Sequence, residues 1–107
     1  MSAGGDWHRA VARAEVRAGE VIGVKLGGVE VALIELGGEV HAIGDVCPHA
    51  YALLSQGYLE GEEIECPLHA ARFDIRRGKC LEGPINEDVA TYRVKVEGGD
   101  VWVMVPA

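Results

Sequence analysis

Two short segments of this chain each offer one cysteine and one histidine as potential metal ligands. The first segment reads Cys47-Pro48-His49 and the second reads Cys66-Pro67-Leu68-His69. Thiolate and imidazole groups bind zinc and iron, but one such pair does not complete a site with four ligands. We therefore expect the chain to fold back so that the two segments meet. Turn-forming residues at 55–57 and 60–62 allow that return.

The spacing of these four residues fits two kinds of metal centre. A tetrahedral zinc ion is commonly held by two cysteines and two histidines. A two-iron cluster with one iron on a cysteine pair and the other on a histidine pair takes the same side chains. Ligand count alone leaves both possibilities open. A disulfide between Cys47 and Cys66 is a third possibility, but it leaves the two neighbouring histidines without a role.

The residues around both segments resemble a known family. The matching runs are Cys47-Pro48-His49, Cys66-Pro67-Leu68-His69-Ala70-Ala71-Arg72-Phe73-Asp74, Arg77-Gly78-Lys79 and Gly83-Pro84. They resemble the two cluster loops and the proline loop of Rieske-type ferredoxins. The likeness extends from Trp7 to Val105, and it is closest to the small ferredoxins that serve bacterial ring-hydroxylating oxygenases.

The resemblance implies a cofactor and a function. It implies one [2Fe-2S] cluster per chain, with Cys47 and Cys66 on the inner iron and His49 and His69 on the outer iron. It implies an electron carrier with no catalytic residues, which passes electrons from a flavin reductase to a terminal oxygenase in aromatic hydrocarbon catabolism. A Rieske subunit of another redox system, such as a nitrite-reductase-type assembly or a monooxygenase, is the main alternative. A structural zinc module is a remote one.

The chain also departs from some members of this family. Relatives in cytochrome complexes join the two loops by a disulfide, but the matching positions here are Ala52 and Leu68. The same relatives have a serine and a tyrosine whose hydroxyls donate hydrogen bonds to sulfur, where this chain has Ala71 and Phe73. Such donors stabilise the reduced, more negative cluster, so their loss predicts a low reduction potential. Ala70 stands where the family usually has glycine.

Composition limits the class of protein. The chain has 107 residues, of which 49% are hydrophobic, so we expect one folded domain and no disorder. A net charge of −7 argues against nucleic-acid binding and favours a basic protein partner. We see no membrane-spanning run and no signal peptide, and we expect a soluble, cytoplasmic monomer. The third cysteine, Cys80, is expected to lie in a turn without a special role.

The pattern of apolar residues predicts strands throughout. Apolar alternation, β-branched residues and glycine pairs predict strands at 7–11, 20–24, 29–36, 40–43, 92–97 and 101–105. Only residues 50–55 suggest a short helix. Short strands and glycine turns imply an all-β sandwich or barrel. The resemblance adds three stacked antiparallel sheets in a single domain, 1–107, with an inserted cluster-binding subdomain at about 45–85.

Several other residues have simpler interpretations. We expect His8 and His41 to be packed or surface residues, and Trp7 and Trp102 to pack in the core. The acidic residues between the two segments are expected to form a solvated edge that helps to orient a partner. They are Glu60, Glu62, Glu63 and Glu65. By resemblance, the run Gly83-Pro84-Ile85 covers the cluster and limits water access.

Overall fold

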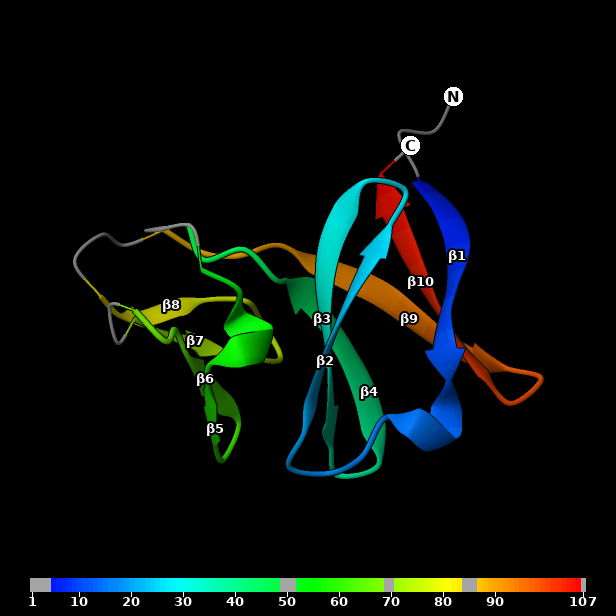
Figure 1. The fold of residues 1–107 in the computed structure, drawn as a ribbon, viewed down its shortest axis with the longest axis horizontal. Helices are drawn as coiled ribbons and strands as arrows, with labels where there is room; N and C mark the ends of the chain where they lie inside the picture. Colours follow the sequence, from blue (N-terminus) through cyan, green and yellow to red (C-terminus); the bar gives the residue numbers. More distant parts are fainter. Residues whose placement is uncertain (1–4, 49–51, 69–70, 84–86, 107) are drawn as a thin grey trace.

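Six strands form one antiparallel sheet in the order β1-β10-β9-β4-β3-β2 (Figure 1). The computed structural model describes residues 5–48, 52–68, 71–83 and 87–106. The strands of the large sheet are β1 (Gly5–Ala12), β2 (Val21–Leu26), β3 (Val29–Leu36), β4 (Glu39–Gly44), β9 (Thr91–Glu97) and β10 (Asp100–Pro106). Each of the six predicted strands is present, within one or two residues of its expected ends.

The large sheet is divided into two halves that share β9. Residues 93–97 of β9 pair with β10, whereas Thr91 and Tyr92 pair with Ile43 and Ala42 of β4. The strands β1, β10 and β9 therefore form one half, and β4, β3 and β2 form the other (Figure 1).

A second, four-stranded sheet is built between β4 and β9 of the sequence. It has the order β5-β6-β7-β8, and all neighbouring strands are antiparallel. Its strands are β5 (Tyr58–Glu60), β6 (Glu63–Glu65), β7 (Arg72–Asp74) and β8 (Cys80–Glu82). Together with the two halves of the large sheet, it makes three antiparallel sheets. The predicted all-β fold is confirmed.

Glycine pairs form the tight turns of the large sheet, as expected. Both glycines have positive φ angles in the turns at 27–28, 37–38 and 98–99, which is the requirement of a type I′ hairpin. The two short helices are of the 3-10 type, η1 (Arg13–Glu15) and η2 (Leu54–Gln56). The predicted helix at 50–55 is therefore wrong within its described part. Leu53 is in an isolated bridge with Val46, so the turn begins only at Leu54.

The central strand β3 is buried on both faces, and this connects the two hydrophobic clusters of the molecule. Val31 and Leu33 point into the cluster enclosed by the large sheet, with Val101, Val103 and Val105 of β10. Ala32 and Ile34 point into the other cluster, which extends to the four-stranded sheet. Each fully buried side chain of this size contributes about 1.5–3 kcal/mol. Residues 31–34 are all apolar because side chains on both faces of β3 are buried in a hydrophobic cluster.

The tryptophans lie outside both clusters, so their predicted place in the core is wrong. Trp102 alternates with the buried Val101 and Val103 along β10 and occupies the opposite face of the strand. Trp7 of β1 is also only partly buried. The ammonium group of Lys95 lies over both rings, 4.6 Å from the centroid of Trp7 and 5.9 Å from that of Trp102.

Within the described residues, no helix has the length and apolar character that crossing a membrane requires.

Candidate metal centre

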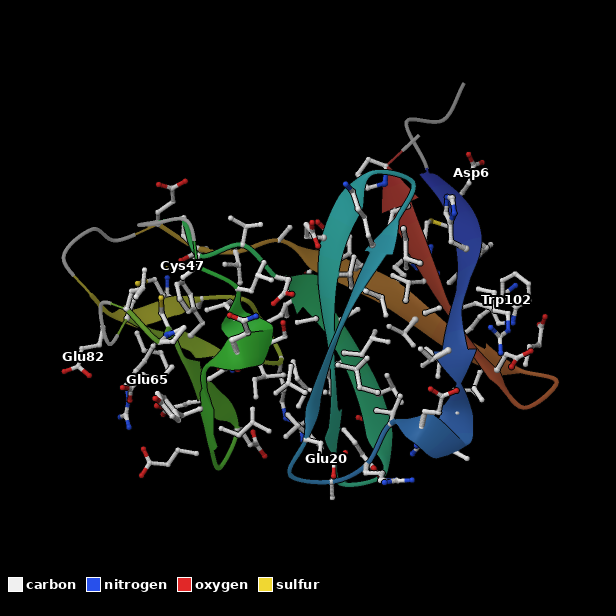
Figure 2. All side chains as sticks on the ribbon, in the orientation of Figure 1. Asp6, Glu20, Cys47, Glu65, Glu82 and Trp102 are labelled. Atoms are coloured by element: carbon white, nitrogen blue, oxygen red, sulfur yellow. The ribbon has the colours of Figure 1, made fainter. Side chains whose placement is uncertain are left out.

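The first cysteine lies in a loop that leaves β4 and returns through η2. The backbone N–H of Cys47 donates to the carbonyl oxygen of Ala52 at 2.9 Å, and Val46 forms a bridge with Leu53. The Cys47 residue is only 1% exposed, and Ala52 is 8% exposed. The loop therefore closes on itself and directs Cys47 into the protein (Figure 2).

The second cysteine lies in an equivalent loop between β6 and β7. The N–H of Cys66 donates to the carbonyl oxygen of Ala71 at 2.7 Å, so each cysteine bonds to an alanine five residues later. Cys66 is 1% exposed and Ala71 is fully buried. The antiparallel pairing of β6 with β7 holds the two ends of this loop together.

Both cysteines belong to one hydrophobic cluster, which supports a shared metal centre. They are buried together with Leu54, Ile64 and Phe73. All three cysteines of the chain are described, and none is in a disulfide. Two buried thiols in one apolar cluster suit the sulfur ligands of an iron–sulfur cluster. The alternative of a disulfide between Cys47 and Cys66 is therefore excluded.

The two predicted histidine ligands, His49 and His69, lie outside the described residues. Among the residues that are described, no group of three or more cysteine, histidine or acidic side chains is placed to hold a metal ion. The predicted ligand set of Cys47, His49, Cys66 and His69 thus stays a prediction. The proline loop is described only up to Gly83.

Cys80 differs from its predicted place in a turn. It lies in β8 opposite Phe73, is 8% exposed and belongs to the same cluster as the other two cysteines. Its backbone N–H donates to Oδ1 of Asp88 at 2.8 Å, and its thiol contacts the carbonyl oxygen of Glu82 at 3.7 Å. The sequence signal for this strand was a single apolar pair, Cys80-Leu81, which is too short to read as β structure.

Exposed apolar side chains lie in or beside the two cysteine loops. Leu68 is 64% exposed, Val46 is 42% exposed and Leu81 of β8 is 48% exposed. Pro48 of the first loop is partly buried, and Ala50, Tyr51, Ala70 and Pro84 lie outside the described residues. The described part of this end of the molecule is therefore apolar at several surface positions.

The acidic residues of the four-stranded sheet are paired with arginines. Arg72 of β7 forms ion pairs with Glu60, Glu63 and Glu65, the last two at 3.5 Å each. These charges, that of Glu60 first, raise the pKa of Arg72. Arg76 donates through Nε to Glu62 at 2.9 Å. The predicted acidic edge is thus partly neutralised within the sheet.

The remaining histidines are on the large sheet, as predicted. His41 lies on β4, with Nε2 3.6 Å from Oε1 of Glu39. His8 lies on β1 beside Gly27, where a Cβ atom would approach the His8 ring within 3.2 Å. Within the described part of the chain, neither belongs to a metal-binding group.

Comparison with known proteins agrees with this arrangement. The profile of the Rieske [2Fe-2S] domain family matches residues 6–93. The chain is 48% identical to the ferredoxin component of the naphthalene 1,2-dioxygenase system of Pseudomonas putida, over 91% of this chain and 93% of that protein. It is 45% identical to the 3-phenylpropionate/cinnamic acid dioxygenase ferredoxin subunit of Escherichia coli K12, over 87% of this chain and 88% of the relative.

Solved structures lead to the same family. The ferredoxin of carbazole 1,9a-dioxygenase from Nocardioides aromaticivorans superposes with a TM-score of 0.87 at 35% identity, covering 94% of this chain and 98% of that chain. A ferredoxin in complex with the oxygenase of carbazole 1,9a-dioxygenase gives a TM-score of 0.83 at 31% identity, covering 91% of each chain. The chain therefore belongs to the Rieske [2Fe-2S] domain family, and its cofactor is a [2Fe-2S] cluster.

Proposed function

We propose that this protein is a one-electron carrier of a multicomponent ring-hydroxylating dioxygenase system. It accepts an electron from a flavin-dependent reductase and delivers it to a terminal oxygenase. The observation that carries the proposal is the burial of Cys47 and Cys66 in one cluster, in two loops that each have a hydrogen bond from the cysteine N–H to the carbonyl oxygen five residues later. Two similar proteins are named as the ferredoxin component and the ferredoxin subunit of dioxygenase systems. The protein is an electron-transfer component, not an enzyme.

The cysteine and histidine residues have separate roles in this proposal. Cys47 and Cys66 hold the inner iron, and His49 and His69 hold the outer iron nearer the surface. When bound, the cluster supplies a one-electron redox couple. The protein residues around Cys47 and Cys66 keep water away, since both side chains are almost completely buried. Residues 45–85 form the cluster-binding subdomain of the single domain 1–107.

The partners are a reductase and a terminal oxygenase, each bound transiently. A related ferredoxin is described in complex with the oxygenase of carbazole 1,9a-dioxygenase. Leu68 and Val46 are exposed in the cysteine loops, which suits the small contacts of electron-transfer partners. The net charge of −7 favours a basic surface on the partner. We further propose that the carrier is a cytoplasmic monomer.

A Rieske subunit of a different redox system is the second candidate. The small subunit of a putative NADH-dependent nitrite reductase from Mycobacterium tuberculosis matches with a TM-score of 0.83 at 29% identity, covering 96% of this chain and 97% of that chain. Both proteins are therefore of similar length and fold. Only the partner distinguishes the two functions.

The test has a spectroscopic part and a functional part. Purified protein should absorb visible light when oxidised and give an EPR signal of a Rieske cluster after reduction, whereas a zinc protein is colourless and EPR-silent. Reconstitution with a flavin reductase and a ring-hydroxylating oxygenase should then restore NADH-dependent hydroxylation of an aromatic substrate. A Rieske spectrum without transfer to any such oxygenase would favour the second candidate.

A further inference from the structure

Asp45 is the one acidic or basic residue that is almost fully buried in the described part of the chain. It is 1% exposed. Its Oδ1 accepts the backbone N–H of Ser55 at 2.7 Å, and its Oδ2 accepts the Ser55 hydroxyl at 2.7 Å. Both carboxyl oxygens of Asp45 therefore have a hydrogen-bond partner in Ser55. Burying a polar side chain is costly unless it is hydrogen-bonded, so the position of this pair requires a reason.

The Asp45–Ser55 pair lies at the base of the loop that carries Cys47. Above the pair, the N–H of Leu54 donates to the carbonyl oxygen of Asp45 at 2.7 Å. The bridge between Val46 and Leu53 follows, and then the bond from Cys47 to Ala52 at 2.9 Å. The side-chain contacts of Asp45 with Ser55 therefore extend the backbone pairing that joins the two ends of the loop, and this pairing positions Cys47.

The same pair attaches this loop to the large sheet. A Cβ atom at Gly23 of β2 would lie 2.6 Å from Oγ of Ser55 and 2.8 Å from Oδ2 of Asp45, so only glycine allows this approach. The φ angle of Gly23 is not among the positive ones of the chain, and thus space rather than backbone conformation requires glycine. The N–H of Asp45 also donates to the carbonyl oxygen of Glu30 in β3 at 3.0 Å.

We propose that Asp45 and Ser55 are positioning residues that clamp the Cys47 loop and so slow the loss of the cluster. The inference rests on the proposed role of Cys47 as an iron ligand. No disulfide closes this loop, so the side-chain clamp is its non-covalent closure.

The clamp is tested by the rate of cluster loss. Ser55→Ala removes one hydrogen bond and keeps the charge, and Gly23→Ala forces Asp45 and Ser55 apart with no change of charge. We expect both variants to lose their visible absorbance at least threefold faster than wild type in the presence of an iron chelator. The matched control is Asp100→Asn, which removes one charge from the exposed ion pair with Arg9, in the hairpin far from Cys47 (Figures 1 and 2).

The position of Cys47 is tested by EPR spectroscopy. Because the clamp holds the Cys47 loop in place, Ser55→Ala and Gly23→Ala should shift the g values of the reduced cluster, whereas Asp100→Asn should leave them unchanged. A loss of overall stability alone would speed cluster loss without shifting these values.

The outcomes separate this inference from the proposed function. Wild-type loss rates in both Ser55→Ala and Gly23→Ala would overturn the clamp. A wild-type protein without a Rieske spectrum would instead overturn the proposed function.

Discussion

The backbone N–H of Cys66 donates a hydrogen bond to the carbonyl oxygen of Ala71 at 2.7 Å. This contact places the Ala71 methyl group in the same cluster as the cysteine side chain. Phe73, two residues later, is also fully buried in that cluster. The two positions therefore surround the second cysteine with hydrocarbon, and neither side chain has a hydroxyl group to donate to sulfur.

The first prediction is that the cluster has a low reduction potential, and that hydroxyl groups introduced at positions 71 and 73 raise it. The native value should lie near the bottom of the range of about −150 to +300 mV that is known for Rieske centres. Ala71→Ser and Phe73→Tyr should each raise this potential. Each kcal/mol by which the new hydrogen bond stabilises the reduced cluster more than the oxidised cluster raises it by about 40 mV. Spectroelectrochemical titration measures these values. Ala42→Ser, buried in the other hydrophobic cluster, is the control. A native potential in the upper half of the range would contradict the prediction.

The strands of the large sheet were predictable because their apolar residues alternate between glycine pairs. In β10, Val101, Val103 and Val105 face inward, and the turn at 98–99 precedes them. The face of Trp102 was not predictable, because Trp102 and Met104 make the second face of β10 apolar as well. Periodicity then cannot distinguish the core side from the outer side.

The strands of the small sheet could not be predicted from periodicity. β6 reads Glu63-Ile64-Glu65 and β7 reads Arg72-Phe73-Asp74, each with a single apolar residue between charged ones. Three residues are too few to establish a period of two, and the four glutamates near β5 and β6 suggested a solvated edge. The stabilising partners Arg72 and Arg76 come later in the sequence, so only the fold brings the charges together. The proposed cysteine ligands could be predicted because each lies in a short local motif.

The second prediction concerns the outer iron. Replacing His69 by cysteine adds a thiolate in place of a neutral imidazole, so the cluster becomes more negative. We expect the protein to keep a cluster, to have a lower potential and to reduce the oxygenase more slowly. EPR, redox titration and stopped-flow reduction of the oxygenase measure these three effects. Substitution of His41, which lies on β4, is the control and should change none of them. Unchanged turnover of the His69→Cys variant would contradict the proposed role of His69 as a ligand of the outer iron.

The third prediction concerns Arg72 and its glutamates. Arg72→Gln leaves Glu60, Glu63 and Glu65 close together without their shared cation. We expect a lower melting temperature at low salt because the three carboxylates repel one another, and partial recovery at high salt because this repulsion is screened. Thermal unfolding at two NaCl concentrations measures the effect. Arg17→Gln removes an exposed cation from the segment before β2 and serves as control. An equal loss at both salt concentrations would argue against electrostatic repulsion.

The fourth prediction is a pH dependence of stability at Glu62. The hydrogen bond from Arg76, and then its charge, lower the pKa of Glu62 in the folded protein. A lowered folded pKa stabilises the protein above the pKa of the unfolded chain, and this contribution is lost as the pH falls through the folded value. Glu62→Gln should therefore unfold more readily than wild type near neutral pH. The difference should begin to shrink as the pH falls below about 4, the ordinary pKa of a glutamate, and should vanish below the lowered pKa of the folded protein. Denaturant unfolding at several pH values measures it, and a constant difference would exclude the ion pair as its cause.

The fifth prediction is that the tryptophans do not relay electrons. Trp102 lies at the end of the molecule opposite Cys47 (Figure 2), and Lys95 binds the rings of Trp7 and Trp102 on the outer face of the sheet. Trp7→Phe and Trp102→Phe should leave the rate of electron transfer to the oxygenase unchanged. Lys95→Met should lower the stability by about 0.5–1 kcal/mol for each lost cation–π contact at these partly exposed positions. Stopped-flow reduction and urea unfolding distinguish the two effects. A slower transfer in either Phe variant, with its cluster spectrum intact, would show that electrons pass through this face of the sheet.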